Sequence, residues 1–348
     1  MPASIAGKTL ANCRDRRPEG TCGGVVGGIV HGNRQAGARM SALVGIGLKI
    51  LLGGGIGYAA RRGGMVGDRF GAQINALLLA VVAPAAIIAS ASSTRFSPDL
   101  AGDLGTGAAI AAIYFAVAWA GLAPASRILP LPRDERHMMV NLSVMPNTGF
   151  VGFPVAYEMF GPQGLLCAAA VDLVYNLVAY TVGLRWLTSS HPPRPREMLR
   201  NSPLLASVCA IVLFFSPVHL PGVVTEAVGM VGAMMTPLAM MILGISLAES
   251  SLPDLWRNTW GYLACGLRLV VLPAAVWAGL RFAGVGGLAA QVAVVSLAMP
   301  SGTLNAILGG RYDVGYRFAV HTVVQSNVLM FVTLPMVLLL PRVPGASG

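Results

Sequence analysis

Apolar runs of bilayer length recur along most of the chain, and this pattern restricts the possible folds more than any other feature. A helix needs roughly 20 apolar residues to cross the hydrocarbon core of a membrane. Hydrophobic residues make up 55% of the chain and charged residues 11%, whereas about a quarter of the residues in a soluble domain are charged. The sequence therefore predicts an all-α integral membrane protein. Ten spans are expected, at about 42–60, 72–93, 104–123, 138–160, 163–186, 203–218, 223–248, 259–281, 285–309 and 315–340.

Basic residues between these spans gather on one side of the predicted membrane. Most arginines lie in the connections after odd-numbered spans, whereas the other connections and the C-terminal tail hold only Arg95, Arg281 and Arg342. Cytoplasmic loops are enriched in Lys and Arg, so we expect a multi-pass protein of the plasma membrane or the bacterial inner membrane, with both termini outside. This topology accounts for the net charge of +10. Because no basic face is interleaved with aromatic residues, no nucleic-acid partner is expected.

The N-terminal segment does not fit this topology, because it places further basic residues outside. Its apolar stretch GGVVGGIV is too short and too rich in glycine for the core of a signal peptide. We interpret Met40 as the working start and residues 1–39 as a disordered or wrongly assigned extension.

Two of the spans contain a sequence that breaks a helix. Span four carries SVMPNTGFVGFP at 143–154, and span nine carries AMPSGT at 298–303. Proline removes an amide donor and clashes with the preceding turn, and glycine weakens a helix. Backbone groups freed at membrane depth survive only inside protein or beside a wet cavity, so the paired breaks predict an anion-binding site at half-helix N-termini. The alternative is a pair of proline kinks tolerated for packing.

The landmarks of the first half recur in order in the second half. VMPNTG at 144–149 matches AMPSGT at 298–303. Likewise, Pro84 in span two corresponds to Pro237 in span seven. Since each half holds five spans, an odd number, the second copy enters the membrane inverted, as in many secondary transporters. The expected parts are a first repeat at 40–187, a short cytoplasmic linker at 188–202, a second repeat at 203–342 and a tail at 343–348.

Three segments, NTGFVGFP, TPLAMMILGISLAE and AMPSGTLNAILGGRY, resemble the signature segments of the auxin efflux carrier family. This family, in the bile-acid/auxin transporter superfamily, includes plant auxin exporters and bacterial dicarboxylate or malonate carriers. The resemblance implies ten helices in a 5+5 inverted repeat, with broken helices four and nine crossing over the substrate site. The substrate-binding residues that it implies are Asn147, Thr148, Gly152 and Pro154 in the first motif, and Pro300, Ser301, Gly302 and Asn305 in the second.

The chain departs from the plant carriers in two places. Their long hydrophilic central loop, which receives regulatory phosphorylation, is replaced by the short linker at 188–202, so that regulation is not expected. Asn305 stands where the plant carriers tend to have a second proline, so auxin itself is not assigned as the substrate.

Ionisable residues inside the spans are the other functional signal. Asp172 lies about nine residues into span five, roughly 13 Å deep at about 1.5 Å per residue, and Asn176 follows at i+4 on the same face. We consider both as candidates for ion or proton coupling, against the alternative of a hydrogen-bonded core acid. His321 and Gln325 form a second i, i+4 pair that could relay protons or form a satisfied core pair. Lys49 in span one could have a functional role, or its long side chain could equally reach the membrane interface.

The sequence predicts a secondary active transporter that moves a small organic anion, a malonate- or auxin-like mono- or dicarboxylate, by alternating access. The alternatives are a passive anion channel and, less favoured, a membrane-embedded enzyme, for which no acid, base and nucleophile converge. No cofactor or metal is expected, and LGGGIGYA at 52–59 is interpreted as helix packing through small residues. Span nine holds no acidic residue, so a proton is favoured over sodium as the coupling ion. The bilayer is a further partner, and a homodimer is a possible assembly.

Cysteine labelling tests the predicted topology. In a background without native cysteines, cysteines replacing Ser189 in the linker and Ser347 in the tail should face opposite sides, so an impermeant maleimide added outside should reach only the second. Equal labelling of both positions from outside would contradict the inverted repeat.

Overall fold

The computed structural model describes residues 45, 48–49, 51–67, 69–188, 202–218, 220–249 and 258–340. The proposed extension at 1–39, nearly all of the linker at 188–202 and the tail at 343–348 lie outside these ranges. Residues 46–348 form one compact unit, to which the elements named below belong. Within the described ranges every regular element is a helix, and the only β pairing is one isolated bridge. The predicted all-α class is confirmed for this part of the chain.

The helices follow one another through short connections. The first half holds a helix at residues 51–62, α2 (Phe70–Leu77), η1 (Leu78–Val82), α3 (Ala83–Ser93), α4 (Pro98–Ala125), η2 (Ser126–Ile128), α5 (Arg133–Val144), η3 (Thr148–Gly152), α6 (Phe153–Val178), η4 (Ala179–Gly183) and α7 (Leu184–Thr188). The second half holds α9 (Ser202–Phe215), α10 (Gly222–Ala233), α11 (Met235–Glu249), α13 (Thr259–Gly266), η5 (Leu267–Val271), α14 (Leu272–Phe282), α15 (Gly287–Leu297), α16 (Thr303–Tyr312) and α17 (Tyr316–Leu338).

Six helical stretches are long and apolar enough to cross a membrane, which supports a multi-pass membrane protein. They are Phe70–Ser93, Pro98–Ile128, Thr148–Thr188, Gly222–Glu249, Thr259–Phe282 and Tyr316–Val337. The shorter helices α9 and α15 are also apolar. Each predicted span overlaps described helical residues, although part of the first span lies outside them. Ten crossings in two inverted repeats stay a prediction.

The stretch Thr148–Thr188 folds back on itself at Gly161. This glycine, inside α6, has φ 66° and ψ −158°, a conformation essentially restricted to glycine. The Thr148 hydroxyl lies 2.5 Å from a carboxylate oxygen of Asp172, 24 residues later. A straight helix would separate these residues by about 36 Å. Predicted spans four and five are therefore separate helices on either side of Gly161.

A π-helical turn of five residues precedes a proline in three helices. η1 is followed by Pro84, η3 by Pro154 and η5 by Pro273, each as the second residue of the next helix. Proline donates no amide, and its ring clashes with the carbonyl four residues earlier. We attribute the wider π turns to this clash, since they let the helix continue through the proline.

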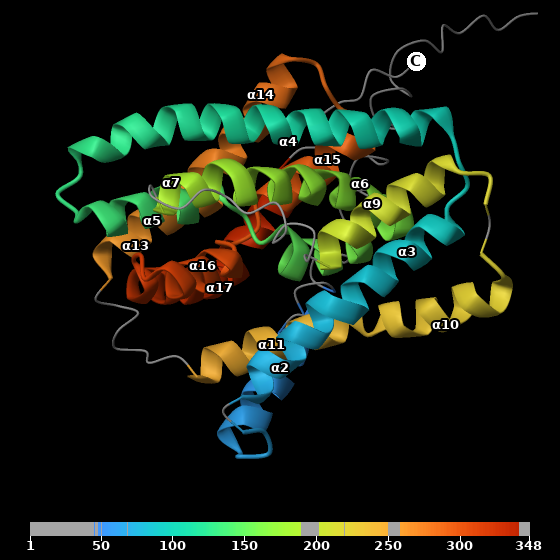
Figure 1. Cartoon of the computed structure of the whole chain (residues 1–348), viewed down its shortest axis with the longest axis horizontal. Helices are drawn as coiled ribbons and strands as arrows, with labels where there is room; N and C mark the ends of the chain where they lie inside the picture. The colour runs from blue at the N-terminus through green and yellow to red at the C-terminus, as the bar shows by residue number, and fades with distance from the viewer. Residues whose placement is uncertain are drawn as a thin grey trace, which may run out of the picture. The chain divides into compact units, whose positions relative to one another are not determined.

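The helices pack in two neighbouring groups (Figure 1). In the first group α4 lies along α6 and α15, and α17 packs on α13 and α16. In the second group α3 packs on α9 and α10, and α2 packs on α11. Contacts of α6 with α3, α9 and α11 join the groups. The two helix breaks, at 145–147 and 298–302, lie buried in the first group.

The helix at 51–62 packs on α11 through glycines. A Cβ atom on Gly57 would overlap the Met241 carbonyl, and one on Gly244 would overlap the Gly54 carbonyl. The two backbones approach too closely for any larger residue, which confirms that LGGGIGYA is a packing segment.

Candidate functional site

The two helix breaks contact each other directly. The Asn147 amide donates to the Pro300 carbonyl at 2.8 Å, and the Gly302 amide donates to the Met145 carbonyl at 2.9 Å. The bonds run antiparallel and form the isolated bridge of the fold. Each break thus supplies one donor and one acceptor to the other, which satisfies backbone groups that lipid could not.

Ser301 and Gly302 hold this contact together. A Cβ atom on Gly302 would lie 3.0 Å from the Tyr175 hydroxyl, so a larger residue would push the breaks apart. The Ser301 hydroxyl donates to the Leu142 carbonyl at 2.9 Å, and its amide donates to the Ser326 hydroxyl at 3.0 Å. Both polar groups of Ser301 are therefore used within the protein, although this residue was expected to bind substrate.

Arg268, which the sequence analysis did not select, binds both breaks and is fully buried. Its Nε donates to the Met299 carbonyl at 2.9 Å. Its Nη1 donates to the Val144 carbonyl at 2.9 Å and to the Tyr114 hydroxyl at 2.6 Å. A longer bond, of 3.3 Å, reaches the Ser143 carbonyl. One guanidinium group thus holds the last carbonyls before each break.

These carbonyls lie at the negative ends of two half-helices, where a cation is favourable. α5 ends at Val144, and α15 ends shortly before Met299. A planar guanidinium with several donors can bind both ends at once, whereas an ammonium group acts as a point charge. A signal for Arg268 was present, because a charged residue in the middle of the apolar segment LACGLRLVV is costly without a function.

A cavity of about 330 Å³ lies beside the first break. Of the residues predicted from sequence, Asn147, Thr148, Asp172 and Asn176 line this cavity. Parts of α2, η1, α9 and α16 complete its wall. The structure therefore brings two predicted substrate-binding residues and one predicted coupling pair into a single cavity.

Asp172 is buried at 1% exposure and accepts a hydrogen bond on each carboxylate oxygen. Thr148 Oγ1 donates to Oδ1 at 2.5 Å, and Asn176 Nδ2 donates to Oδ2 at 2.7 Å. No Lys or Arg side chain among the described residues forms an ion pair with it. The acid is therefore held by neutral donors, one of which is the first residue of the half-helix after the break.

The wall at the first break also offers hydrogen-bond donors. Asn147 caps η3, with its Oδ1 accepting from the Phe150 amide at 3.2 Å. Its buried Nδ2 has no partner among the described residues. Thr148 and Gly149 follow in the first turn, whose amides have no acceptor within the helix, and both residues line the cavity. This wall can therefore donate to a negatively charged ligand.

The other predicted binding residues support the breaks and are absent from the lining of this cavity. Gly152 and Pro154 lie where η3 passes into α6, so Pro154 continues a helix and does not form the break. The Pro300 carbonyl accepts from Asn147. The Asn305 side chain donates to the Gly302 carbonyl at 3.1 Å.

The second predicted coupling pair is not part of this cavity either. Gln325 Nε2 donates to the Asn258 carbonyl at 3.2 Å, and Gln325 Oε1 accepts from Asn258 Nδ2 at 3.2 Å. Asn258 caps α13. His321 lies one turn earlier on α17 and is partly exposed. The alternative of a satisfied packing pair is the better description of Gln325.

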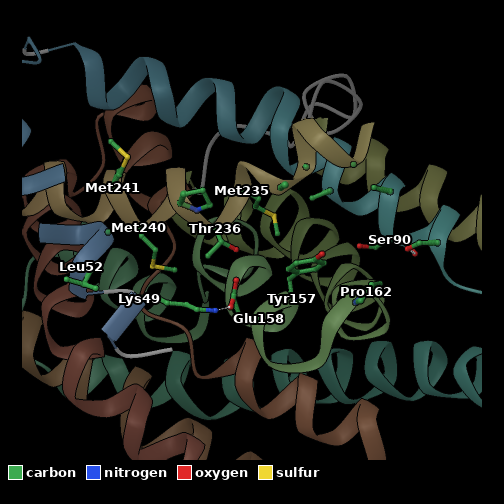
Figure 2. Close-up of a pocket in the computed structure, with 18 of the residues that line it drawn as sticks. Lys49, Leu52, Ser90, Tyr157, Glu158, Pro162, Met235, Thr236, Met240 and Met241 are labelled. Carbon is green, nitrogen blue, oxygen red and sulfur yellow. Dashed lines mark hydrogen bonds and ion pairs between the residues drawn. The ribbon is translucent and has the colours of Figure 1, made fainter. Parts of the chain in front are cut away.

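A larger cavity, of about 670 Å³, lies elsewhere and has a mainly apolar wall. Figure 2 shows Lys49 reaching toward Glu158 among the methionine side chains of α11. The two charges pair at 2.5 Å, but the Lys49 side chain is 62% exposed, and pairs in such surroundings contribute little. Because the predicted polar residues converge at the smaller cavity, we take that cavity as the candidate functional site.

Comparison with known proteins extends over both breaks and the cavity. Residues 47–338 match the family model described as "Membrane transport protein". An uncharacterized transporter of Methanocaldococcus jannaschii is 24% identical over 275 residues, which cover 77% of this chain and 89% of that protein. An uncharacterized transporter of Methanothermobacter thermautotrophicus is 27% identical over 294 residues, which cover 81% of this chain and 92% of that protein.

Replacement of Arg268 tests its role at the crossing. Arg268→Lys should lower the free energy of unfolding by about 2 kcal/mol or more, because a single ammonium group loses at least one charged hydrogen bond. Thermal unfolding of the purified protein in detergent measures this loss. Arg281→Lys, at an arginine beside Trp277 and away from the breaks, is the matched control. Equal stability of the two variants would show that Arg268 does not hold the breaks.

Proposed function

The chain belongs to the auxin efflux carrier family of membrane transport proteins, and from this membership we propose that it is a secondary active transporter for a small organic anion. The proposed substrate is a mono- or dicarboxylate, malonate- or auxin-like in chemistry, carried across the cell membrane by alternating access. The observation that carries this proposal is the cavity beside the first break, whose wall contains the start of the half-helix η3 and the buried acid Asp172.

The proposal includes two five-helix repeats in inverted orientation, at 40–187 and 203–342, with both termini outside. The reciprocal bonds between the breaks support it, because exchange of the two segments turns one bond into the other. Two segments related by a two-fold axis produce this pattern. The proline landmarks that recur in the same order in both halves are independent support.

Binding of a carboxylate is supported by the donors at the first break. The Asn147 side-chain amide and the first-turn amides of η3 carry partial positive charge toward the cavity, which favours an anion at a half-helix N-terminus. The cavity volume of about 330 Å³ lies at the small end of the range for ligand pockets. A small acid fits these properties better than a large amphipathic one.

In the proposed carrier, Asp172 would couple binding of the anion to binding of a proton. An ionised Asp172 would repel a carboxylate in the same cavity, and two negative charges at membrane depth are costly. A proton on Asp172 removes this repulsion. Of its two donors only the Thr148 hydroxyl can turn and accept a hydrogen bond from the protonated acid, since the Asn176 amide nitrogen cannot accept. Protonation is therefore expected at Oδ1, and it would reverse the hydrogen bond to the Thr148 hydroxyl at the start of η3.

Substitution of Asp172 tests the coupling. Asp172→Asn mimics the protonated acid, so the variant should still fold and exchange substrate but should lose uptake driven by a pH gradient. Uptake into proteoliposomes with and without the gradient measures this. Asp99→Asn, at an exposed acid in the first turn of α4, should behave as the unaltered protein. An unchanged pH profile in Asp172→Asn would leave the residue as a hydrogen-bonded core acid.

Counterflow tests the substrate class and separates a carrier from a channel. Proteoliposomes loaded with an unlabelled carboxylate should accumulate the labelled acid, which a passive channel cannot achieve. The neutral amide analogue should bind more weakly by about 1.5–3 kcal/mol, the value of a charged hydrogen bond. Asn147→Ala should weaken the acid more than the amide.

Asn305→Ala is the control for this experiment, because the Asn305 side chain bonds to the protein backbone outside the cavity. It should change the two affinities equally. Labelled acid that equilibrates without accumulating would indicate a channel, and equal binding of acid and amide would place the substrate elsewhere.

A further inference from the structure

A second polar cavity, of about 680 Å³, is lined by four arginines and has no acidic residue in its wall. It is formed where α4 passes through η2 into α5, together with the end of the α6–α7 segment. The arginines are Arg127, Arg133, Arg136 and Arg185. The transport mechanism proposed above does not use this cavity.

The positive charges of four arginines gather around one space, and this arrangement favours a bound anion. Arg127, Arg133 and Arg185 are exposed and Arg136 is half-buried, so their guanidinium groups remain reachable by a ligand. The charges of the nearby arginines also act on His137, which lies before predicted span four. Burial lowers the pKa of His137, and the charges of Arg133 and Arg136 lower it further. Like charges held around one space are unfavourable unless a counter-charge is present.

Two tryptophans in the same wall add donors that have no acceptor. Trp119 is 8% exposed, and its indole Nε1 has no hydrogen-bond partner among the described residues. The indole Nε1 of Trp186, whose ring lies 4.6 Å from the ring of His137, is also buried and unpartnered. Indole nitrogen and guanidinium groups donate only. Because the indole nitrogens are covered by protein, the donors that a ligand in the cavity can reach are the arginine guanidinium groups, and phosphate oxygens bind arginine well.

The surroundings favour a lipid as the source of the phosphate. Val182 lines the cavity with an apolar side chain at 47% exposure. An acyl chain can cover such a surface, whereas a free phosphate ion cannot. Tryptophans are enriched at membrane interfaces, and basic pockets between membrane helices bind anionic headgroups.

We infer that this cavity binds the phosphate of an anionic phospholipid, whose acyl chain lies against the exposed side chain of Val182. Arg136 and Arg185 provide the charge and the donors for the phosphate, and Trp119 and Trp186 form part of the cavity wall. The site is separate from the substrate cavity, since the two share no lining residue.

Native mass spectrometry of the full-length protein tests this inference. Titration with dioleoyl phosphatidylglycerol should give a bound lipid that phosphatidylcholine does not replace. The double variant Arg136→Gln, Arg185→Gln should bind it about 30-fold more weakly, as expected for two lost arginines at about 1 kcal/mol each. The matched control is Arg281→Gln, which removes an arginine that also lies beside a tryptophan, 5.8 Å from the Trp277 ring centroid, but outside the cavity; it should bind as the unaltered protein.

Three results would overturn the inference. The double variant could bind phosphatidylglycerol with unchanged affinity, or Arg281→Gln could weaken binding equally, which would indicate a general charge effect. Inorganic phosphate could displace the lipid at millimolar concentration, which would make the free ion the ligand. If the double variant does not fold, Arg185→Gln alone replaces it, because Arg185 is exposed, and it should still weaken lipid binding severalfold.

Discussion

The contact of Arg268 with the two broken helices is the interaction on which the rest of the site depends. Each half-helix ends in carbonyls that carry partial negative charge, and the breaks bring the carbonyls of Val144 and Met299 to the same place. Without a cation these ends would repel each other in surroundings that screen charge poorly. The guanidinium group, itself costly to bury, is stabilised by the same carbonyls. Neither the crossing nor the buried cation is favourable alone.

The crossing separates the negative carbonyl ends of the half-helices from the positive amide end that follows the first break. The carbonyl ends of the half-helices bind Arg268, while the amide end after the first break faces the cavity that contains Asp172. A single arrangement of two interrupted helices thus places a half-helix N-terminus beside the cavity where we propose that a negative group binds. The proposed transport chemistry follows from this arrangement. The ionised acid and the anion would repel each other in the cavity, and a proton on Asp172 would remove this repulsion.

Sequence reasoning predicted the helical class, the two breaks and four of the residues that line the cavity. Asp172, Asn176, Asn147 and Thr148 were found because local rules apply to them: a charge at membrane depth, i, i+4 spacing and a proline-glycine break. Ser301 and Asn305 were assigned from the resemblance of the second motif to the family's signature segment. Their partners, Leu142 and Gly302, are set by tertiary contacts that no repeat pattern contains. Arg268 was missed because, of the basic residues within the spans, only Lys49 was considered, and the carbonyls that Arg268 binds come from other helices.

The bonds between the two breaks join main-chain atoms only, and this has a consequence for how such proteins diverge. A contact made by backbone amides and carbonyls tolerates most side-chain replacements, apart from positions such as Gly302, where a Cβ atom would lie only 3.1 Å from the Pro146 carbonyl. Selection can therefore alter Asn147 or its neighbours in the cavity without rebuilding the crossing. The crossing thus depends on main-chain atoms, whereas ligand preference depends on side chains in the cavity. Relatives that share the crossing can therefore change their substrate through a few mutations.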